Sequence, residues 1–178
     1  QIAGLAEWKI HGFAAQADFY RDQAAEYRRK DQKVVVIISD ALRYEVAEEC
    51  LRRIRALDRF DADLKPMISA LPSYTQLGMA ALLPHNGLAM AEDGSGDILA
   101  GGENTKGLLA REKLLAAGRV GDSAKALKAE DVMNMRTEDG KALFRDNHIV
   151  YVYHNRIDAI GDKLQTEDKL PEAAEDAI

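Results

Sequence analysis

The sequence is organised around an uncharged run of branched residues, 34–38, that ends at Asp40. Branched side chains suit the pleated backbone of a strand, and a run without charge is typical of a strand buried on both faces of a parallel sheet. Residues 41–57 then place apolar side chains near one stripe of a helix. We therefore expect Asp40 at the carboxyl end of a central strand, where open α/β sheets bind their ligands.

Composition limits the classes of protein to which the chain can belong. The 178 residues are enough for one α/β domain, and 47% hydrophobic with 30% charged residues is typical of a soluble globular protein. A net charge of -6 argues against a broad basic surface for nucleic acid, although it leaves room for a local basic cleft. The single cysteine, Cys50, excludes a disulfide framework and suits a reducing cytoplasm.

The sequence shows no membrane-spanning run and no signal peptide. It begins within a pattern at Gln1 and ends in a helical run at Ile178, so we expect a fragment of a longer protein. The cations Arg28 to Lys30 are expected to close the first helix at its negative end. Expected helices lie at 5–29, 41–57, 76–83, 106–117, 123–135 and from 171 onward, and expected strands at 34–39, 61–70, 88–91, 97–100 and 148–154.

The second clear sheet strand, 148–154, leads into a polar segment, 155–163, that we expect to be a loop. This segment carries Asp158 and Asp162, and His154 ends the strand itself. Residues 101–105 are a further expected loop, and residues 138–147 have no clear pattern.

The sequence combines three features that suit metal-assisted phosphoryl or sulfuryl transfer. They are a carboxylate at a strand end, a hydroxyl at the start of a helix, and a second strand end with carboxylates and a histidine. Carboxylate oxygens and imidazole bind divalent metals, and a bound metal lowers the pKa of a coordinated hydroxyl. A helix N-terminus adds free N–H groups for an anion.

Each of these residues also has a purely structural interpretation. Ser73 and Thr75 are residue types that cap helices, and Arg43 is of a type that most often forms a surface ion pair. His154 is equally explained as a neutral histidine bonded at a strand end. The two aspartates of the polar segment are equally explained as capping or solvating residues.

Three segments, 35–49, 71–85 and 151–163, closely resemble the PglZ family. That family belongs to the alkaline phosphatase superfamily and is a component of BREX phage-defence systems. The resemblance extends from about Phe19 to the end of the chain. It implies a mostly parallel α/β fold, with residues 1–30 as a helical lead-in and residues 31–178 as the N-terminal portion of an alkaline phosphatase-like domain.

The resemblance also implies roles for individual residues. Asp40 matches the first metal-binding aspartate of the superfamily. Thr75 lies where the superfamily carries its nucleophile, with Ser73 as a rival and Thr105 as a third candidate. We assign Arg43 as a candidate phosphate-binding residue beside them.

The match to the remaining metal ligands of the superfamily is less complete. Asp158 matches the aspartate of the superfamily's Asp-x-x-Gly-His segment, but Asp162 stands where relatives have histidine. His154 is a further candidate ligand. The Asp-His pair and the last histidine of the superfamily have no match before Ile178, so we expect this stretch alone to be inactive or to bind metal weakly.

The activity implied is metal-dependent hydrolysis of phosphate esters by a cytoplasmic phosphatase or phosphodiesterase of antiviral defence, with a threonine nucleophile and a two-metal site containing zinc. Substrates are phosphate esters, with nucleic-acid-derived compounds included, and partners are other BREX components such as the methyltransferase. A scaffold that only assembles those components is the alternative.

A third hypothesis is a phospho-acceptor at Asp40. It requires an acidic pair before the strand, and Asp31 lies too far upstream to supply one.

Overall fold

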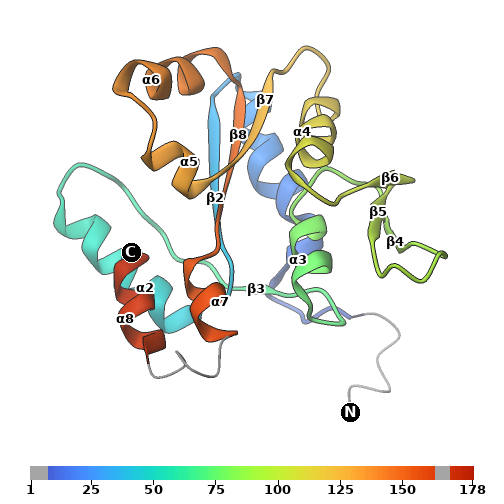
Figure 1. The fold of residues 1–178 in the computed structure, drawn as a ribbon, viewed down its shortest axis with the longest axis horizontal. Coiled ribbons are helices and arrows are strands. Elements are labelled where there is room, and N and C mark those ends of the chain that lie inside the picture. The colour runs from blue at the N-terminus through green and yellow to red at the C-terminus, as the bar shows by residue number, and fades with distance from the viewer. Residues whose placement is uncertain (1–7, 163–168) are drawn as a thin grey trace. The chain divides into compact units, whose positions relative to one another are not determined.

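The structure is a computed structural model that describes residues 8–162 and 169–178 (Figure 1). The strands are β1 (Ala14–Ala15), β2 (Val34–Ser39), β3 (Met67–Ile68), β4 (Leu88–Met90), β5 (Ile98–Ala100), β6 (Glu103–Asn104), β7 (Ala124–Lys128) and β8 (Ile149–His154). The helices are η2 (Gln16–Asp18, 3-10), η3 (Tyr20–Ala24, π), α1 (Ala25–Arg29), α2 (Tyr44–Ala56), α3 (Thr75–Ala81), α4 (Leu108–Ala117), α5 (Ala129–Met133), α6 (Thr137–Asp146), α7 (Arg156–Gly161) and α8 (Leu170–Asp176).

The chain forms two compact units. The first contains the residues up to Val36 and Met67–Val152, and the second contains Ile37–Pro66 and Tyr153–Ile178. The main sheet has the strand order β2-β8-β7 (Figure 1). Val34 N donates to His148 O at 3.0 Å, and Asp40 N donates to His154 O at 2.9 Å. Residue numbers therefore increase in the same direction along both strands, so β2 and β8 are parallel.

β8 is the central strand, and its sequence explains its position. Residues Ile149 to Tyr153 are all buried, as expected for branched and aromatic side chains with no charge. Val150 and Val152 pack with Ala129 of α5 in a small apolar cluster. The strand predicted at 148–154 is therefore confirmed.

The expectation that β2 is buried on both faces is wrong. Val35 is 48% exposed and Ile37 is 70% exposed, whereas Ile38 is buried. The reason is that the described elements cover only one face of β2, which is the edge strand of this sheet beside β8. The alternating pattern of exposure shows that one face of the strand is covered and the other is open.

The N-terminal segment of the first unit differs from the amphipathic helix or helix pair predicted at 5–29, of which residues 5–7 lie outside the described residues. β1 pairs in parallel with β3, and helical turns follow from Gln16 onward. Gln16 explains this arrangement, because its amide donates to Gly78 O at 3.2 Å and accepts from Ala70 N at 3.1 Å. A side chain bonded to backbone groups in this way fixes an irregular segment in place.

The predicted hairpin is confirmed, with β4 and β5 antiparallel and Leu88 opposite Ala100. The loop expected at 101–105 contains the additional strand β6, which pairs with β5. The tight reversal between β5 and β6 uses Gly101 and Gly102 at φ values of 58° and 90°, a region that side chains disfavour.

Two further helix and loop expectations are wrong. Residues 123–135, predicted as a helix, begin as strand β7 and become helical only at α5. The segment 155–163, predicted as a loop, contains α7. The helix predicted at 41–57 begins three residues later, at Tyr44, because Ala41 has a φ of 60° and therefore lies outside the right-handed helical region.

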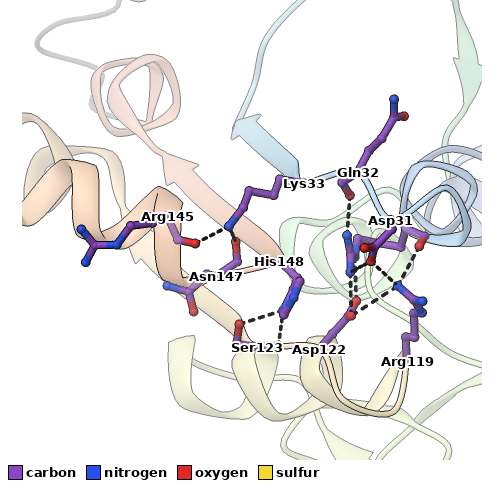
Figure 2. Close-up of polar contacts among 10 residues, drawn as sticks. Asp31, Gln32, Lys33, Arg119, Asp122, Ser123, Arg145, Asn147 and His148 are labelled. Atoms are coloured by element: carbon purple, nitrogen blue, oxygen red, sulfur yellow. Dashed lines mark hydrogen bonds and ion pairs between the residues drawn. The ribbon is translucent and has the colours of Figure 1, made fainter.

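A polar network joins the segments that enter the three strands of the main sheet (Figure 2). Arg28 is 1% exposed and forms a fork with Asp122, with Nε and Nη2 each 2.8 Å from a carboxylate oxygen. Lys33 donates to the carbonyls of Phe144 and Asn147, each at 3.0 Å. These contacts tie the amino ends of β2, β7 and β8 together.

The second unit consists of the ends of β2 and β8 with α2, α7 and α8. Its helices carry exposed ion pairs, such as Arg53 with Glu175 at 2.9 Å and Arg156 with Asp176 at 2.5 Å. Within the described ranges, no helix has the length and apolar character that crossing a membrane requires.

Candidate functional site

The carboxyl end of β2 forms a sharp corner at Asp40. The next residue, Ala41, has a φ of 60°, and its N–H donates to Asp40 Oδ1 at 3.0 Å. Left-handed backbone costs a non-glycine residue about 1–2 kcal/mol, so the surrounding structure must hold this turn in place. The corner fixes the Asp40 carboxylate at the strand end, as the sequence predicts.

His154 lies beside this corner at the end of the neighbouring strand. Its backbone carbonyl accepts from Asp40 N at 2.9 Å, and its Nδ1 lies 3.0 Å from Ser39 Oγ. Two parallel neighbouring strands thus bring together Ser39, Asp40 and His154. The sequence indicated the last two of these but not Ser39, whose only signal was its place directly before the aspartate.

The contact between Ser39 and His154 agrees with the structural interpretation that a bonded histidine lies at the strand end. It also fixes the orientation of the ring, because one ring nitrogen is already engaged. Such a histidine presents its second nitrogen in a defined direction, which is what a ligand or a proton donor needs.

Arg43 is the N-cap residue of α2, and no side-chain hydrogen bond caps that helix. Arg52 and Arg53 in the same helix both pair with Glu49, and they lower the pKa of Glu49 to about 2. Among the described residues no ion pair of Arg43 is recorded, so the surface pairing considered for it is not observed there. Its exposed guanidinium therefore stays a candidate for binding an anion.

Arg43 lines a cavity of about 430 Å³ within the second unit. The walls are mainly apolar side chains and include Val46 of α2, Ile157 of α7 and Leu170 of α8. Ala41, which forms the strained corner, also contributes to the lining. A hollow of this size and character next to a strand end is typical of small-molecule binding sites.

Asp158 lies in α7 and Asp162 is the C-cap residue of that helix, with Asp162 N donating to Asp158 O at 2.9 Å. Asp158 is partly buried and Asp162 is exposed. With Asp40 and His154 they supply carboxylate and imidazole donors, whose chemistry fits a divalent metal. Within residues 8–162 and 169–178, however, no three histidine, cysteine, aspartate or glutamate side chains lie close enough together to hold a metal ion.

Ser73 and Thr75 belong to the first unit, whereas Asp40, Arg43 and His154 belong to the second. Thr75 is exposed and is the first residue of α3, whose N-cap is Tyr74 without a side-chain hydrogen bond. Neither hydroxyl therefore occupies the N-cap position of α3. An exposed hydroxyl without this engagement is what a nucleophile requires.

Thr105 differs from these two hydroxyls. It is 1% exposed, and its Oγ1 donates to Ile98 O at 2.8 Å. The hydroxyl secures the segment after β6 to β5, so a structural role explains it fully. Thr105 is accordingly the weakest of the three nucleophile candidates.

Comparison with known proteins decides the family. The profile described as "BREX system PglZ alkaline phosphatase-like domain" matches residues 19–178, which is most of the chain and begins where the sequence resemblance does. The chain belongs to the PglZ family. Its fold class, an alkaline phosphatase-like α/β domain, follows from that membership and agrees with the parallel strands of the main sheet.

Two PglZ relatives match nearly the whole chain. The "Alkaline phosphatase-like protein BrxZ" of Escherichia coli O9:H4 (strain HS) is 41% identical over 176 residues, covering 98% of this chain and 20% of the relative. The "Alkaline phosphatase-like protein PglZ" of Bacillus cereus (strain H3081.97) is 34% identical over 171 residues, covering 96% and 20% respectively. The chain thus spans about a fifth of the length of these relatives. No solved structure matches it.

Proposed function

We propose that this chain is part of a metal-dependent phosphatase or phosphodiesterase domain of a BREX phage-defence protein. The observation that carries the proposal is the corner at the carboxyl end of β2, where Asp40 is held by a left-handed Ala41 beside His154. Strained backbone next to a carboxylate at a strand end is the usual location of chemistry in an open α/β sheet.

Asp40 and His154 would hold a divalent metal, for which zinc is our proposal, together with Asp158 or Asp162. The metal would polarise the phosphoryl group and lower the pKa of the attacking hydroxyl. The further ligands would come from parts of the full-length protein outside this chain, because the curated relatives are about five times as long. Arg43 would bind a phosphoryl oxygen through its guanidinium.

Thr75 is the proposed nucleophile, with Ser73 as its rival. As its Oγ–P bond forms, the P–O bond to the leaving alcohol breaks, the threonine proton passes to a base in solution, and the leaving oxygen takes a proton from water. Water then attacks the phosphothreonine, the Oγ–P bond breaks, and the free hydroxyl and the phosphate product are regenerated. The exposure of Thr75 at the start of α3 supports this role.

The test is the Thr75→Ala variant of the full-length protein, assayed for phosphodiester hydrolysis and for a phosphorylated residue by mass spectrometry. We expect loss of both in Thr75→Ala. The matched control is Thr137→Ala, since Thr137 is likewise exposed and the first residue of a helix, α6. Activity retained in Thr75→Ala and lost in Ser73→Ala would transfer the role to Ser73, and activity retained in both variants would overturn a hydroxyl nucleophile here.

A second candidate function is a catalytically degenerate scaffold that assembles other BREX components, such as the methyltransferase, in the cytoplasm. The exposed Asp162, at the position where relatives of the superfamily carry a histidine ligand, favours it. A scaffold predicts normal assembly with those components in Asp40→Asn and Thr75→Ala, together with no hydrolysis by the wild-type protein. An enzyme predicts hydrolysis that both substitutions remove.

A further inference from the structure

Tyr74 lies directly before Thr75, and its side chain anchors the start of α3. The Tyr74 hydroxyl donates to Gly96 O at 3.2 Å, whereas Ser73 and Thr75 on either side are exposed. Tyr74 is also the N-cap residue of α3, and its backbone carbonyl accepts from Gly78 N at 3.0 Å. Tyr74 is therefore bonded both to the first turn of α3 and to the turn that joins β4 and β5.

The hairpin turn, residues 93–97, is itself fixed by local hydrogen bonds. Ser95 N donates to Asp93 Oδ1 at 2.9 Å, and Asp97 N donates to Ser95 Oγ at 3.1 Å. Gly96 has a φ of 74°, a region that side chains disfavour, so glycine suits the residue whose carbonyl faces Tyr74. Side chains that bond to backbone groups two residues away stabilise a turn of this kind.

A second set of contacts ties the hairpin turn to the segment that follows β6. The Asp97 carboxylate lies 2.9 Å from Lys106 Nζ and accepts from Asn104 Nδ2 at 3.2 Å. Lys106 and Asn104 together hold the pKa of Asp97 below its ordinary value, so these contacts persist at neutral pH. The hairpin turn is thus bonded on both sides, and it offers the Tyr74 hydroxyl a fixed acceptor.

A nucleophilic hydroxyl has to lie in line with the P–O bond that breaks, and a misplacement of about 1 Å can cost about a hundredfold in rate. No side-chain hydrogen bond caps α3, so capping does not fix the direction of the Thr75 side chain. The bond between Tyr74 and Gly96 restrains the peptide that precedes Thr75 instead. We infer that Tyr74 is a positioning residue, which holds the Thr75 hydroxyl in line for attack by anchoring the start of α3 to the hairpin turn. This inference rests on the proposed role of Thr75 as the nucleophile.

The experiment is the Tyr74→Phe variant of the full-length protein, which loses the hydroxyl and keeps the ring. We measure kcat and KM separately for phosphodiester hydrolysis. The expected result is a kcat lowered by about tenfold to a hundredfold with KM unchanged, because the variant still binds the substrate but misplaces the attacking oxygen. A kcat equal to that of wild type would overturn the inference.

The matched control is Tyr151→Phe at the other end of the same helix. The Tyr151 hydroxyl donates at 2.8 Å to the carbonyl of Leu82, the C-cap residue of α3. This variant removes the same kind of bond from α3 without touching the residues before Thr75, and its kcat should equal that of wild type. An equal fall of kcat in the two variants would assign the effect to general loosening of α3 and would overturn the inference.

A double-mutant cycle tests the path through the hairpin turn. Asp97→Asn releases Lys106 and should lower kcat in the same direction as Tyr74→Phe. The double variant should lose no more than Tyr74→Phe alone, because Asp97 acts on Thr75 through Tyr74. Additive losses would overturn this path, and Asp97→Asn serves as the test if Tyr74→Phe does not fold.

Thr75→Ala separates this inference from the function on which it rests. An inactive Thr75→Ala together with a fully active Tyr74→Phe overturns the positioning role and leaves Thr75 as the nucleophile. Hydrolysis that persists in Thr75→Ala overturns the nucleophile and the positioning role with it.

Discussion

The two ends of β2 and β8 differ in how their polar groups are used. At the amino end, Arg28 and Asp122 form a buried fork and Lys33 binds the carbonyls that end α6. At the carboxyl end, Asp40 is held in a strained turn and His154 contacts Ser39. The amino end is built from polar groups that satisfy one another, although Asp31 there has a left-handed φ of 57°, a conformation that aspartate tolerates better than alanine. The carboxyl end holds the ligand-type groups Asp40 and His154 beside the left-handed Ala41, with a φ of 60°. The difference separates the end that stabilises the sheet from the end where we place the chemistry.

The largest effect is expected from Arg28→Ala at the amino end. The substitution leaves Asp122, whose side chain is 5% exposed, as a buried charge without its bidentate partner, and should lower the free energy of unfolding by about 3–5 kcal/mol. Urea denaturation at neutral pH measures this change.

The matched control is Arg21→Ala, which removes exposed ion pairs with Asp18 and Asp22. Its expected cost is below about 1 kcal/mol, because solvent screens such pairs. Equal losses in the two variants would show that the buried fork is not the stabilising feature of the amino end.

The same fork predicts the response to acid. Arg28 holds the pKa of Asp122 below its ordinary value of 3.8. A depressed carboxyl pKa stabilises the folded state above the unfolded pKa, and this contribution is lost as the pH falls through the folded pKa. The free energy of unfolding should therefore fall below about pH 3.8 more steeply in wild type than in Asp122→Asn. Identical pH profiles would contradict the assignment.

A pair of serine variants compares the two ends directly. Ser123 Oγ donates to Asp146 O at 2.8 Å and lies 2.9 Å from His148 Nδ1, whereas Ser39 Oγ has its recorded contact with His154. Ser39→Ala should lower the free energy of unfolding by about 0.5–1.5 kcal/mol, the usual value of one lost hydrogen bond. Ser123→Ala should lower it by about 1–2 kcal/mol, because the Asp146 carbonyl also loses this donor. Urea denaturation measures both changes. A larger loss in Ser39→Ala would reverse the ranking of the two ends.

The smallest effect is expected at the corner itself. Ala41→Gly relieves a left-handed conformation but adds chain entropy to the unfolded state, so a net gain of up to about 1 kcal/mol is predicted. The control, Ala47→Gly inside α2, should lose about 1 kcal/mol instead. A loss in both variants, measured by thermal unfolding, would show that the turn is not strained.

The sequence predicted the elements whose pattern is local. β8, the β4–β5 hairpin, α4 and the placement of Asp40 at a strand end follow from side-chain periodicity and turn residues. The segment of β7 was predicted as helix because its Ala-Lys-Ala-Leu-Lys sequence has no β-branched residue. α7 was not predicted because a helix of six residues is too short for a helical period to be recognised in the sequence.

The contacts that the sequence did not predict join residues far apart in the chain. Arg28 was expected to close a helix at its negative end, but it pairs with a carboxylate 94 residues away. Ser39 and His154 are 115 residues apart, and their contact depends on the order of the strands. The resemblance identified Asp40 and Thr75 as candidates, yet their roles remain proposals that stand on chemistry rather than on local pattern.

The most direct test of the account compares one aspartate from each end of β2. Asp31 lies at the amino end, where it is exposed and 3.5 Å from both Arg28 and Arg119, and Asp40 lies at the carboxyl end. The measurement is phosphodiester hydrolysis and bound divalent metal in full-length wild type, Asp31→Asn and Asp40→Asn. We expect loss of both in Asp40→Asn, by about a hundredfold or more for hydrolysis, and no change in Asp31→Asn. Equal activity and metal content in the three proteins would contradict it.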